Sequence, residues 1–129
     1  MDLLIDTHAA IWFVTENEKL PLKTKKIIES VENTCYVSLA TFWEIAIKHS
    51  LGRLDLHSDL KRVFDIIEQT GFELLPITTG HILVNASLSH HHHDPFDRII
   101  IAQAIHEGLQ IVTKDEQFVQ YDVPVIWEK

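Results

Sequence analysis

Met1-Asp2-Leu3-Leu4-Ile5-Asp6-Thr7-His8 is the stretch of sequence that decides the fold. The apolar run Leu3–Ile5 predicts a short buried β-strand, and Asp6 follows this run without an intervening turn residue. Residues that directly follow the carboxyl ends of strands in an open α/β sheet converge on one crevice. We therefore expect Asp6 to lie at the mouth of such a crevice, beside any other acidic residue at a comparable boundary.

Strand-like and helical segments alternate along the rest of the chain. Strands are predicted at 34–37, 72–75, 109–112 and 123–126, and helices at 7–14, 21–31, 39–51, 59–70, 79–88 and 95–107. Ser58 and Asp94 are the expected N-caps of two helices, and Pro124 favours an edge position for the last strand. The alternation predicts one α/β domain over residues 1–129, with a mostly parallel central sheet of four to five strands in a three-layer α/β/α arrangement.

Composition and charge restrict the classes of function. A hydrophobic content of 46% and a charged content of 23% are typical of a globular domain and exclude a disordered chain. The single cysteine, Cys35, lies in an apolar run and is expected to be buried, and no apolar run is long enough to span a membrane. We therefore expect a cytoplasmic protein. The net charge of −8 argues against broad phosphate-backbone binding, but not against a metal-dependent phosphodiesterase, because bound cations reverse the local field.

Three further carboxylates stand at boundaries comparable to that of Asp6. They are Glu44 in Phe42-Trp43-Glu44-Ile45-Ala46, Asp97 in Asp94-Pro95-Phe96-Asp97-Arg98 and Asp115 in Val112-Thr113-Lys114-Asp115. Carboxylates that converge in a crevice repel one another and lose hydration unless a cation neutralises them. Mg²⁺ and Mn²⁺ prefer oxygen ligands, so the joint placement of the four residues predicts a metal site.

Each of these acidic residues also has a purely structural interpretation. Asp6, Asp94 and Asp115 are at positions suited to helix N-caps, and Asp97 lies three residues after Asp94, where a capping box places its second member. Glu44 lies one helical turn before Lys48 and would pair with it. Capping does not require the residues to cluster, whereas metal binding does.

The four segments, in this order, resemble the motifs of PIN-domain proteins and, more narrowly, of the VapC-type toxins of bacterial toxin–antitoxin modules. The resemblance extends from Leu3 to Trp127. It implies a PIN-like fold and an endoribonuclease that uses Mg²⁺ or Mn²⁺, with Asp6, Glu44, Asp97 and Asp115 as metal ligands and catalytic residues and Asp94 as an additional candidate. It also implies an RNA substrate, a cognate antitoxin protein and a homodimer.

Several neighbouring side chains are candidates for contacts with the metal ligands or with RNA. They are Thr7, Lys48, Arg98, Thr113 and Lys114. For Arg98 and Lys114, the alternative to such a contact is an exposed, solvated side chain. The tract His90–His93 is expected to form a solvated loop at the rim of the pocket, because a structural metal site usually draws ligands from separated segments. His8 and His106 are expected to be packing or surface residues.

Two other functions remain open at this point. One is a PIN-like module that binds RNA or protein without cleaving it. The other is a phosphotransfer domain, such as a receiver or a haloacid-dehalogenase-like phosphatase, although Asp6-Thr7-His8 lacks the second Asp of a DxD motif. A homodimer surface is expected at 9–14 and around Leu54 and Leu56, where apolar residues exceed the obvious needs of one small core.

Overall fold

A single sheet of five parallel strands organises the structure, a computed structural model that describes all of residues 1–129. The strands are β1 (Asp2–Ile5), β2 (Thr34–Ser38), β3 (Glu73–Leu75), β4 (Gln110–Val112) and β5 (Val125–Ile126), in the spatial order β3-β2-β1-β4-β5. All four neighbouring pairs are parallel, and β1 is the central strand. The predicted parallel sheet is confirmed, and the strand that follows Pro124 lies at its edge.

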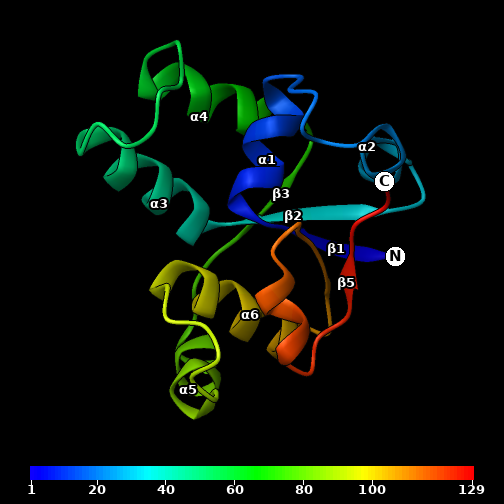
Figure 1. The fold of residues 1–129 in the computed structure, drawn as a ribbon, viewed down its shortest axis with the longest axis vertical. Coiled ribbons are helices and arrows are strands. Elements are labelled where there is room, and N and C mark those ends of the chain that lie inside the picture. The colour runs from blue at the N-terminus through cyan, green and yellow to red at the C-terminus, as the bar shows by residue number, and fades with distance from the viewer.

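Helices cover both faces of the sheet. They are α1 (Thr7–Val14), α2 (Leu22–Glu29), α3 (Leu39–Ser50), α4 (Leu60–Gln69), α5 (Thr79–Ser87) and α6 (Pro95–Glu107), with a short 3₁₀ helix, η1 (Glu116–Gln120). Figure 1 shows α1 to α4 on one side of the sheet and α5 and α6 on the other, which gives the expected three layers. None of the helices combines the length and the apolar composition that crossing a membrane requires.

The period-two alternation of β1 divides the interior into two cores. Leu3 and Ile5 point into the core beneath α1 to α4, whereas Leu4 points into the core that contains α6 and η1. All three side chains are completely buried. A strand covered on both faces must be apolar at consecutive positions, which explains why Leu3–Ile5 shows no polar alternation.

Most predicted helix boundaries agree with the structure, and two are wrong. The N-cap of α4 is Asp59 rather than Ser58, because α4 begins at Leu60 and Asp59 Oδ1 accepts a hydrogen bond from the Arg62 amide (2.8 Å). Helix α2 ends at Glu29 rather than continuing to Val31. The side-chain amide of Asn33 donates to the Ile27 carbonyl there (2.8 Å) and satisfies an acceptor that a further helical turn would have used.

The apolar residues that we expected to form a dimer surface belong to the interior of this chain. Ala9, Ala10 and Ile11 are buried in the core beneath α1 to α4, and Leu56 is only 7% exposed. The remaining residues of this group, Trp12, Phe13, Val14 and Leu54, pack against the same core. The expected dimer surface at 9–14 and Leu54/Leu56 is therefore wrong.

Removing the Asp59 side chain should destabilise the fold, whereas removing that of Ser58 should not. The Asp59→Ala substitution leaves the Arg62 amide without its intramolecular partner and should lower the free energy of unfolding by about 1 kcal/mol. Ser58→Ala, the matched control, should stay within about 0.5 kcal/mol of the wild type. Urea unfolding measures both values, and a larger loss for Ser58→Ala would contradict the assigned N-cap.

Candidate metal centre

Asp6 lies at the carboxyl end of the central strand and uses each of its polar groups differently. Its amide donates to the Val112 carbonyl (3.1 Å), which continues the pairing of β1 with β4. Its Oδ1 accepts from the Ala9 amide (2.8 Å) and caps α1, while Oδ2 accepts from the Thr113 hydroxyl (2.5 Å). The cap inferred from the sequence is thus present, and it uses only one of the two carboxylate oxygens.

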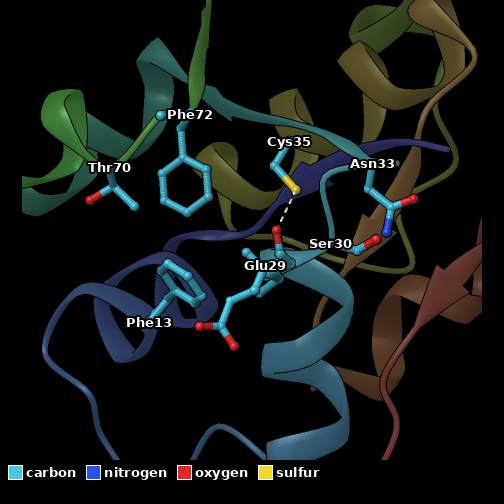
Figure 2. A pocket seen from close by; sticks show the side chains of 9 residues that line it. Phe13, Glu29, Ser30, Asn33, Cys35, Thr70 and Phe72 are labelled. Atoms are coloured by element: carbon cyan, nitrogen blue, oxygen red, sulfur yellow. Dashed lines mark hydrogen bonds between the residues drawn. The ribbon is translucent and has the colours of Figure 1, made fainter.

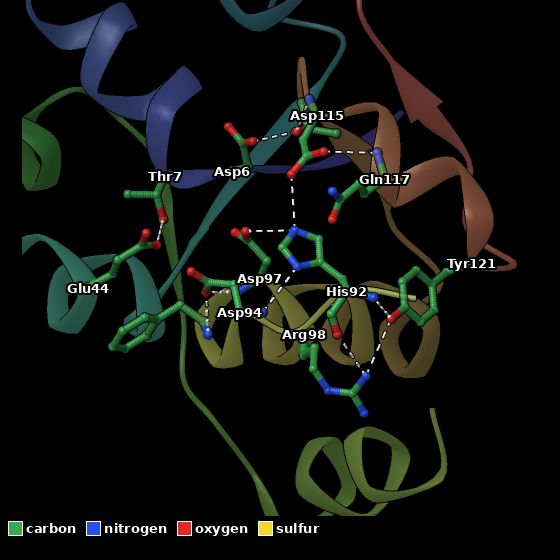
Figure 3. A network of polar contacts seen from close by, with 12 residues as sticks. Asp6, Thr7, Glu44, His92, Asp94, Asp97, Arg98, Asp115, Gln117 and Tyr121 are labelled. Carbon is green, nitrogen blue, oxygen red and sulfur yellow. Dashed lines mark hydrogen bonds and ion pairs between the residues drawn. The ribbon is translucent and has the colours of Figure 1, made fainter. Parts of the chain in front are cut away.

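The side of β1 to which successive strands are added switches after β3, so a topological switch point lies between β1 and β4. Strands β2 and β3 lie on one side of β1, while β4 and β5 lie on the other, so the crevice at the carboxyl ends opens between β1 and β4. Thr113 and Asp115 follow β4 into this crevice, and the Asp115 amide donates to Thr113 Oγ1 (3.0 Å). Asp115 Oδ1 caps η1 through the Gln117 amide (2.9 Å), which leaves Oδ2 for the pocket. Figure 3 shows Asp6, Asp97 and Asp115 around one space.

Glu44 reaches the same region from α3 and is held on both oxygens. The Thr7 hydroxyl donates to Oε1 (2.6 Å), and Lys48 Nζ lies 2.5 Å from Oε2, so the expected pairing with Lys48 is confirmed. Partial burial lowers the pKa of Lys48, but the hydrogen bond to Glu44 and the charges of Glu44, Asp94 and Asp97 outweigh this effect and raise it. Lys48 therefore remains charged and offsets part of the local negative charge.

Asp94 and Asp97 start the deeply packed helix α6. Asp94 Oδ1 accepts from the amides of Phe96 (2.9 Å) and Asp97 (3.0 Å), which confirms its N-cap role. Asp97 does not complete a capping box, because the Asp94 amide donates instead to His92 Nδ1 (3.1 Å). The Asp97 carboxylate turns towards the pocket, where Oδ2 lies 3.1 Å from His92 Nε2.

The pKa values show that the carboxylates share one electrostatic environment. Burial raises the pKa of Asp97 to about 8, and the charges of Asp94, Glu44, Asp6 and Asp115 add to this shift. Burial also raises the pKa of Asp6 to about 6, although hydrogen bonds from Thr113 and Ala9 oppose it. A divalent cation would reverse both shifts, and the donors offered are carboxylate oxygens. These residues therefore fit a hard divalent metal ion.

The expectation that the histidine tract forms a solvated loop is wrong for one of its four members. His90, His91 and His93 are exposed, but His92 is only 8% exposed. Its amide donates to the Tyr121 hydroxyl (2.8 Å), and its Nε2 lies 3.1 Å from both Asp97 Oδ2 and Asp115 Oδ2. Four identical adjacent residues carry no sequence signal that separates His92 from its neighbours.

Arg98 is neither exposed nor available to bind a phosphate. Its side chain is buried, and its guanidinium group donates to main-chain carbonyls at the end of α5 and in the connection between α5 and α6. The acceptors and distances are Ser89 (2.9 Å), Asn85 (3.2 Å), Leu88 (3.3 Å) and His92 (3.3 Å). The expectation of a solvated or RNA-contacting Arg98 is therefore corrected: Arg98 fixes the loop that carries His92.

A pocket of about 360 Å³ adjoins the carboxylates. It is lined by Asp6, His8, Trp12, Lys114 and Asp115. Lys114 and His8 are exposed there, as expected. His106 is also exposed and packs its ring against His81, with 5.2 Å between the ring centroids.

A second pocket, of about 380 Å³, lies beside the amino end of β2 and contains none of the candidate ligands (Figure 2). Cys35 lines it and donates through Sγ to the Ile28 carbonyl (3.6 Å). Burial raises the pKa of this thiol to about 11, so Cys35 is the unreactive buried residue expected from the sequence. The candidate metal ligands lie at the opposite end of the sheet, beyond the carboxyl ends of β1 and β4.

Comparison with known proteins agrees with this arrangement. The sequence model of the PIN domain matches residues 3–124. The chain belongs to the PIN-domain family. A curated relative, "Ribonuclease VapC22" of Mycobacterium tuberculosis, is 27% identical over 119 residues, which are 89% of this chain and 88% of that protein.

Solved structures share the PIN fold at low sequence identity. The structure of VapBC2 from Rickettsia felis, bound to a DNA fragment from its promoter, aligns with a TM-score of 0.76 and 15% identity over 99% of this chain and 100% of that one. VapBC-1 from nontypeable Haemophilus influenzae aligns with a TM-score of 0.71 and 14% identity, covering 98% of this chain and 97% of that one. The resemblance seen in the sequence motifs is confirmed, and the sheet of this PIN domain matches theirs.

Asp97→Asn should remove most of the pH dependence of stability in the metal-free protein. The pKa of Asp97 is about 8 in the fold and 3.8 ordinarily, so between these values the folded chain binds a proton that the unfolded chain lacks. The free energy of unfolding must then fall as the pH rises through this range, and Asp6 adds a decline that ends near its own pKa of about 6. Urea titrations in chelator at about pH 5, 6.5 and 8 measure the slope.

Asp65→Asn is the matched control for this experiment. Asp65 is a half-exposed carboxylate on α4 that pairs with Lys61, and its removal should leave the slope unchanged. Mg²⁺ at about a hundredfold excess over its dissociation constant should add about 2.7 kcal/mol to the stability of the wild type, and less to that of Asp97→Asn. Equal slopes and equal Mg²⁺ responses in wild type and Asp97→Asn would show that these carboxylates do not share a site.

Proposed function

We propose that this PIN-domain chain is a metal-dependent endoribonuclease and the toxin of a toxin–antitoxin pair. The observation that carries the proposal is the group of carboxylates around the crevice between β1 and β4, in which burial and four acidic neighbours raise the pKa of Asp97. The name of the relative from Mycobacterium tuberculosis supports ribonuclease activity, and the VapBC complexes among the structural relatives support an antitoxin partner.

In this proposal the carboxylates of Asp6, Glu44, Asp97 and Asp115 hold Mg²⁺ or Mn²⁺, with Asp94 acting mainly as a cap. An ion held by these carboxylates would supply Lewis acidity towards the phosphate oxygens and would activate water for hydrolysis. Hydrolysis by water breaks the bond to the ribose 3′ oxygen, leaving a 3′-hydroxyl and a 5′-phosphate.

The surrounding side chains position these carboxylates and offset part of their negative charge. Thr113 donates to Asp6 and Thr7 donates to Glu44, which fixes one oxygen of each group in the crevice. Lys48 and Lys114 are the two cations beside the site, and both reduce its repulsion of an RNA phosphate. Lys114 is exposed and unencumbered by an ion pair, so it is the better candidate for direct contact with RNA.

An antitoxin would inhibit this site by covering it with a cationic segment. The pocket formed by Asp6, His8, Trp12, Lys114 and Asp115 offers two carboxylates beside an indole ring. An arginine side chain fits this combination, because its planar guanidinium group pairs with carboxylates and packs on aromatic faces. The net charge of −8 adds a long-range attraction for such a basic partner.

We also propose a homodimer, formed by a surface other than 9–14 and Leu54/Leu56. Exposed apolar side chains gather around a shallow hollow of about 250 Å³ between α3, α5 and α6. This apolar patch consists of Trp43, Ile77, Ile82, Pro95, Phe96 and Ile99. Trp43 is 61% exposed and Ile82 is 55% exposed, a degree of apolar exposure that favours burial against a second copy.

Asp6→Asn and Asp97→Asn should each abolish RNA cleavage without unfolding the domain. Each substitution removes one ligand charge, and we expect a rate loss of more than about 100-fold, because even residues that only orient ligands contribute 10- to 100-fold. Asp94→Asn should retain most of the activity, since Asn is also a good N-cap. The measurement is cleavage of a labelled RNA with Mg²⁺, Mn²⁺ or chelator, with circular dichroism as the check on folding.

Asp65→Asn is again the matched control and should cleave RNA like the wild type. Full activity in highly purified Asp6→Asn protein would contradict the proposed mechanism. Wild-type protein that binds RNA but does not cleave it would favour the non-catalytic module. Hydrolysis of an aryl phosphate without cleavage of RNA would favour a phosphatase.

Ile82→Lys should disrupt the proposed dimer, because it places a charge within the apolar patch. The wild type should have the mass of a dimer in solution at high micromolar concentration, and Ile82→Lys should shift towards the monomer. Val31→Lys is the matched control, since Val31 is fully exposed in the connection between α2 and β2. A monomeric wild type, or an equal shift in both variants, would contradict this surface.

A further inference from the structure

His92 is a buried histidine that none of the predicted ligand roles includes. It lies between Asp97 of α6 and Asp115, which precedes η1 (Figure 3). We propose that His92 is a positioning residue that holds these two carboxylates at a common point through its Nε2–H group and does not itself bind the metal. This inference rests on the proposed function, because it assigns a role within the same site.

The hydrogen bonds of the ring determine which nitrogen carries the hydrogen. The Asp94 amide donates to His92 Nδ1 (3.1 Å), and an amide nitrogen cannot act as the acceptor in return. Nδ1 is therefore without hydrogen, and the neutral ring carries its hydrogen on Nε2. The Asp97 and Asp115 Oδ2 atoms, each 3.1 Å from Nε2, are the acceptors of this donor.

The same tautomer excludes His92 as a metal ligand. His92, Asp97 and Asp115 bring donor atoms close enough together to be taken for a mixed nitrogen and oxygen metal site. A ring nitrogen that keeps its hydrogen has no lone pair to give to a metal ion. Only the carboxylates are then left as ligands, and an all-oxygen donor set fits Mg²⁺ and Mn²⁺ better than Zn²⁺.

The backbone of His92 is fixed by partners from other parts of the chain. The His92 amide donates to the Tyr121 hydroxyl (2.8 Å), and that hydroxyl donates to the Ser89 carbonyl (2.8 Å). The buried guanidinium group of Arg98 donates to the carbonyls of both Ser89 and His92. Restraints of this kind are what a residue needs if it is to place two other side chains accurately.

His92 is also the only direct link between the two carboxylates. Asp97 lies at the start of α6, and Asp115 follows β4, so the two side chains are carried by different elements. No other residue forms a hydrogen bond or ion pair with both carboxylates. Without the Nε2–H donor, no shared contact would hold the two Oδ2 atoms together before the metal binds, and metal affinity would fall.

The experiment combines two spectra of the protein with metal titrations of three variants. Long-range ¹H–¹⁵N NMR of the metal-free protein should show His92 as the Nε2–H tautomer, and pulsed electron paramagnetic resonance of the Mn²⁺ complex should show no directly bound ¹⁴N. His92→Leu should weaken Mn²⁺ binding at least about tenfold. His92→Gln, whose side-chain amide donates from a similar position, should recover part of this loss. His93→Leu, the exposed neighbour, should bind Mn²⁺ like the wild type.

Three results would overturn the inference: an Nδ1–H tautomer, a ¹⁴N coupling that disappears in His92→Leu, or unchanged Mn²⁺ affinity in His92→Leu. The two spectra use the wild type, so they decide the matter even if His92→Leu fails to fold. Wild-type protein that gives the expected spectra and binds Mn²⁺ but cleaves no RNA would overturn the ribonuclease proposal alone.

Discussion

The position of Asp6 is the constraint on which the rest of the site depends. Its amide continues the β1–β4 ladder, its Oδ1 starts α1, and its Oδ2 meets Thr113 at the end of the neighbouring strand. Backbone pairing, helix initiation and the location of one buried charge are therefore coupled in a single residue. A shift of the carboxylate would disturb the ladder and the cap together, so the geometry of the sheet fixes the site.

The fold offsets only part of the negative charge that this geometry concentrates. Lys48 and Thr7 hold Glu44, and His92 donates to Asp97 and Asp115, yet the pKa of Asp97 remains raised to about 8 and that of Asp6 to about 6. In the metal-free fold, the carboxyl groups of Asp97 and Asp6 are thus harder to ionise than in the unfolded chain. A site arranged in this way links the stability of the domain to occupation by a divalent ion, as expected of a metal-dependent enzyme.

The sequence predicted those features that depend on neighbouring residues and missed those that depend on distant ones. The strand before Asp6 and the Asp94 cap follow from local apolar runs and cap chemistry, and both are present. His92 is distinguished from the rest of its tract by contacts with distant residues, among them Tyr121, 29 residues away, and Asp115, 23 residues away. The buried role of Arg98 could not be predicted from the sequence. Arg98 faces a different side of α6 from Asp97, and only the packing of the fold shows that this side meets the end of α5.

Capping and metal binding, which we treated as alternatives in the sequence, are compatible because a carboxylate has two oxygens. Asp6 and Asp115 each give Oδ1 to a main-chain amide and direct Oδ2 towards the crevice. The cap restricts the rotation of each side chain, and the contact with Thr113 or His92 then fixes the second oxygen. The N-terminus of α6 also lies beside Asp97, where its partial positive charge favours an ionised carboxylate. The N-cap roles of these residues are therefore not an alternative to metal binding. They help to align the carboxylates in the site.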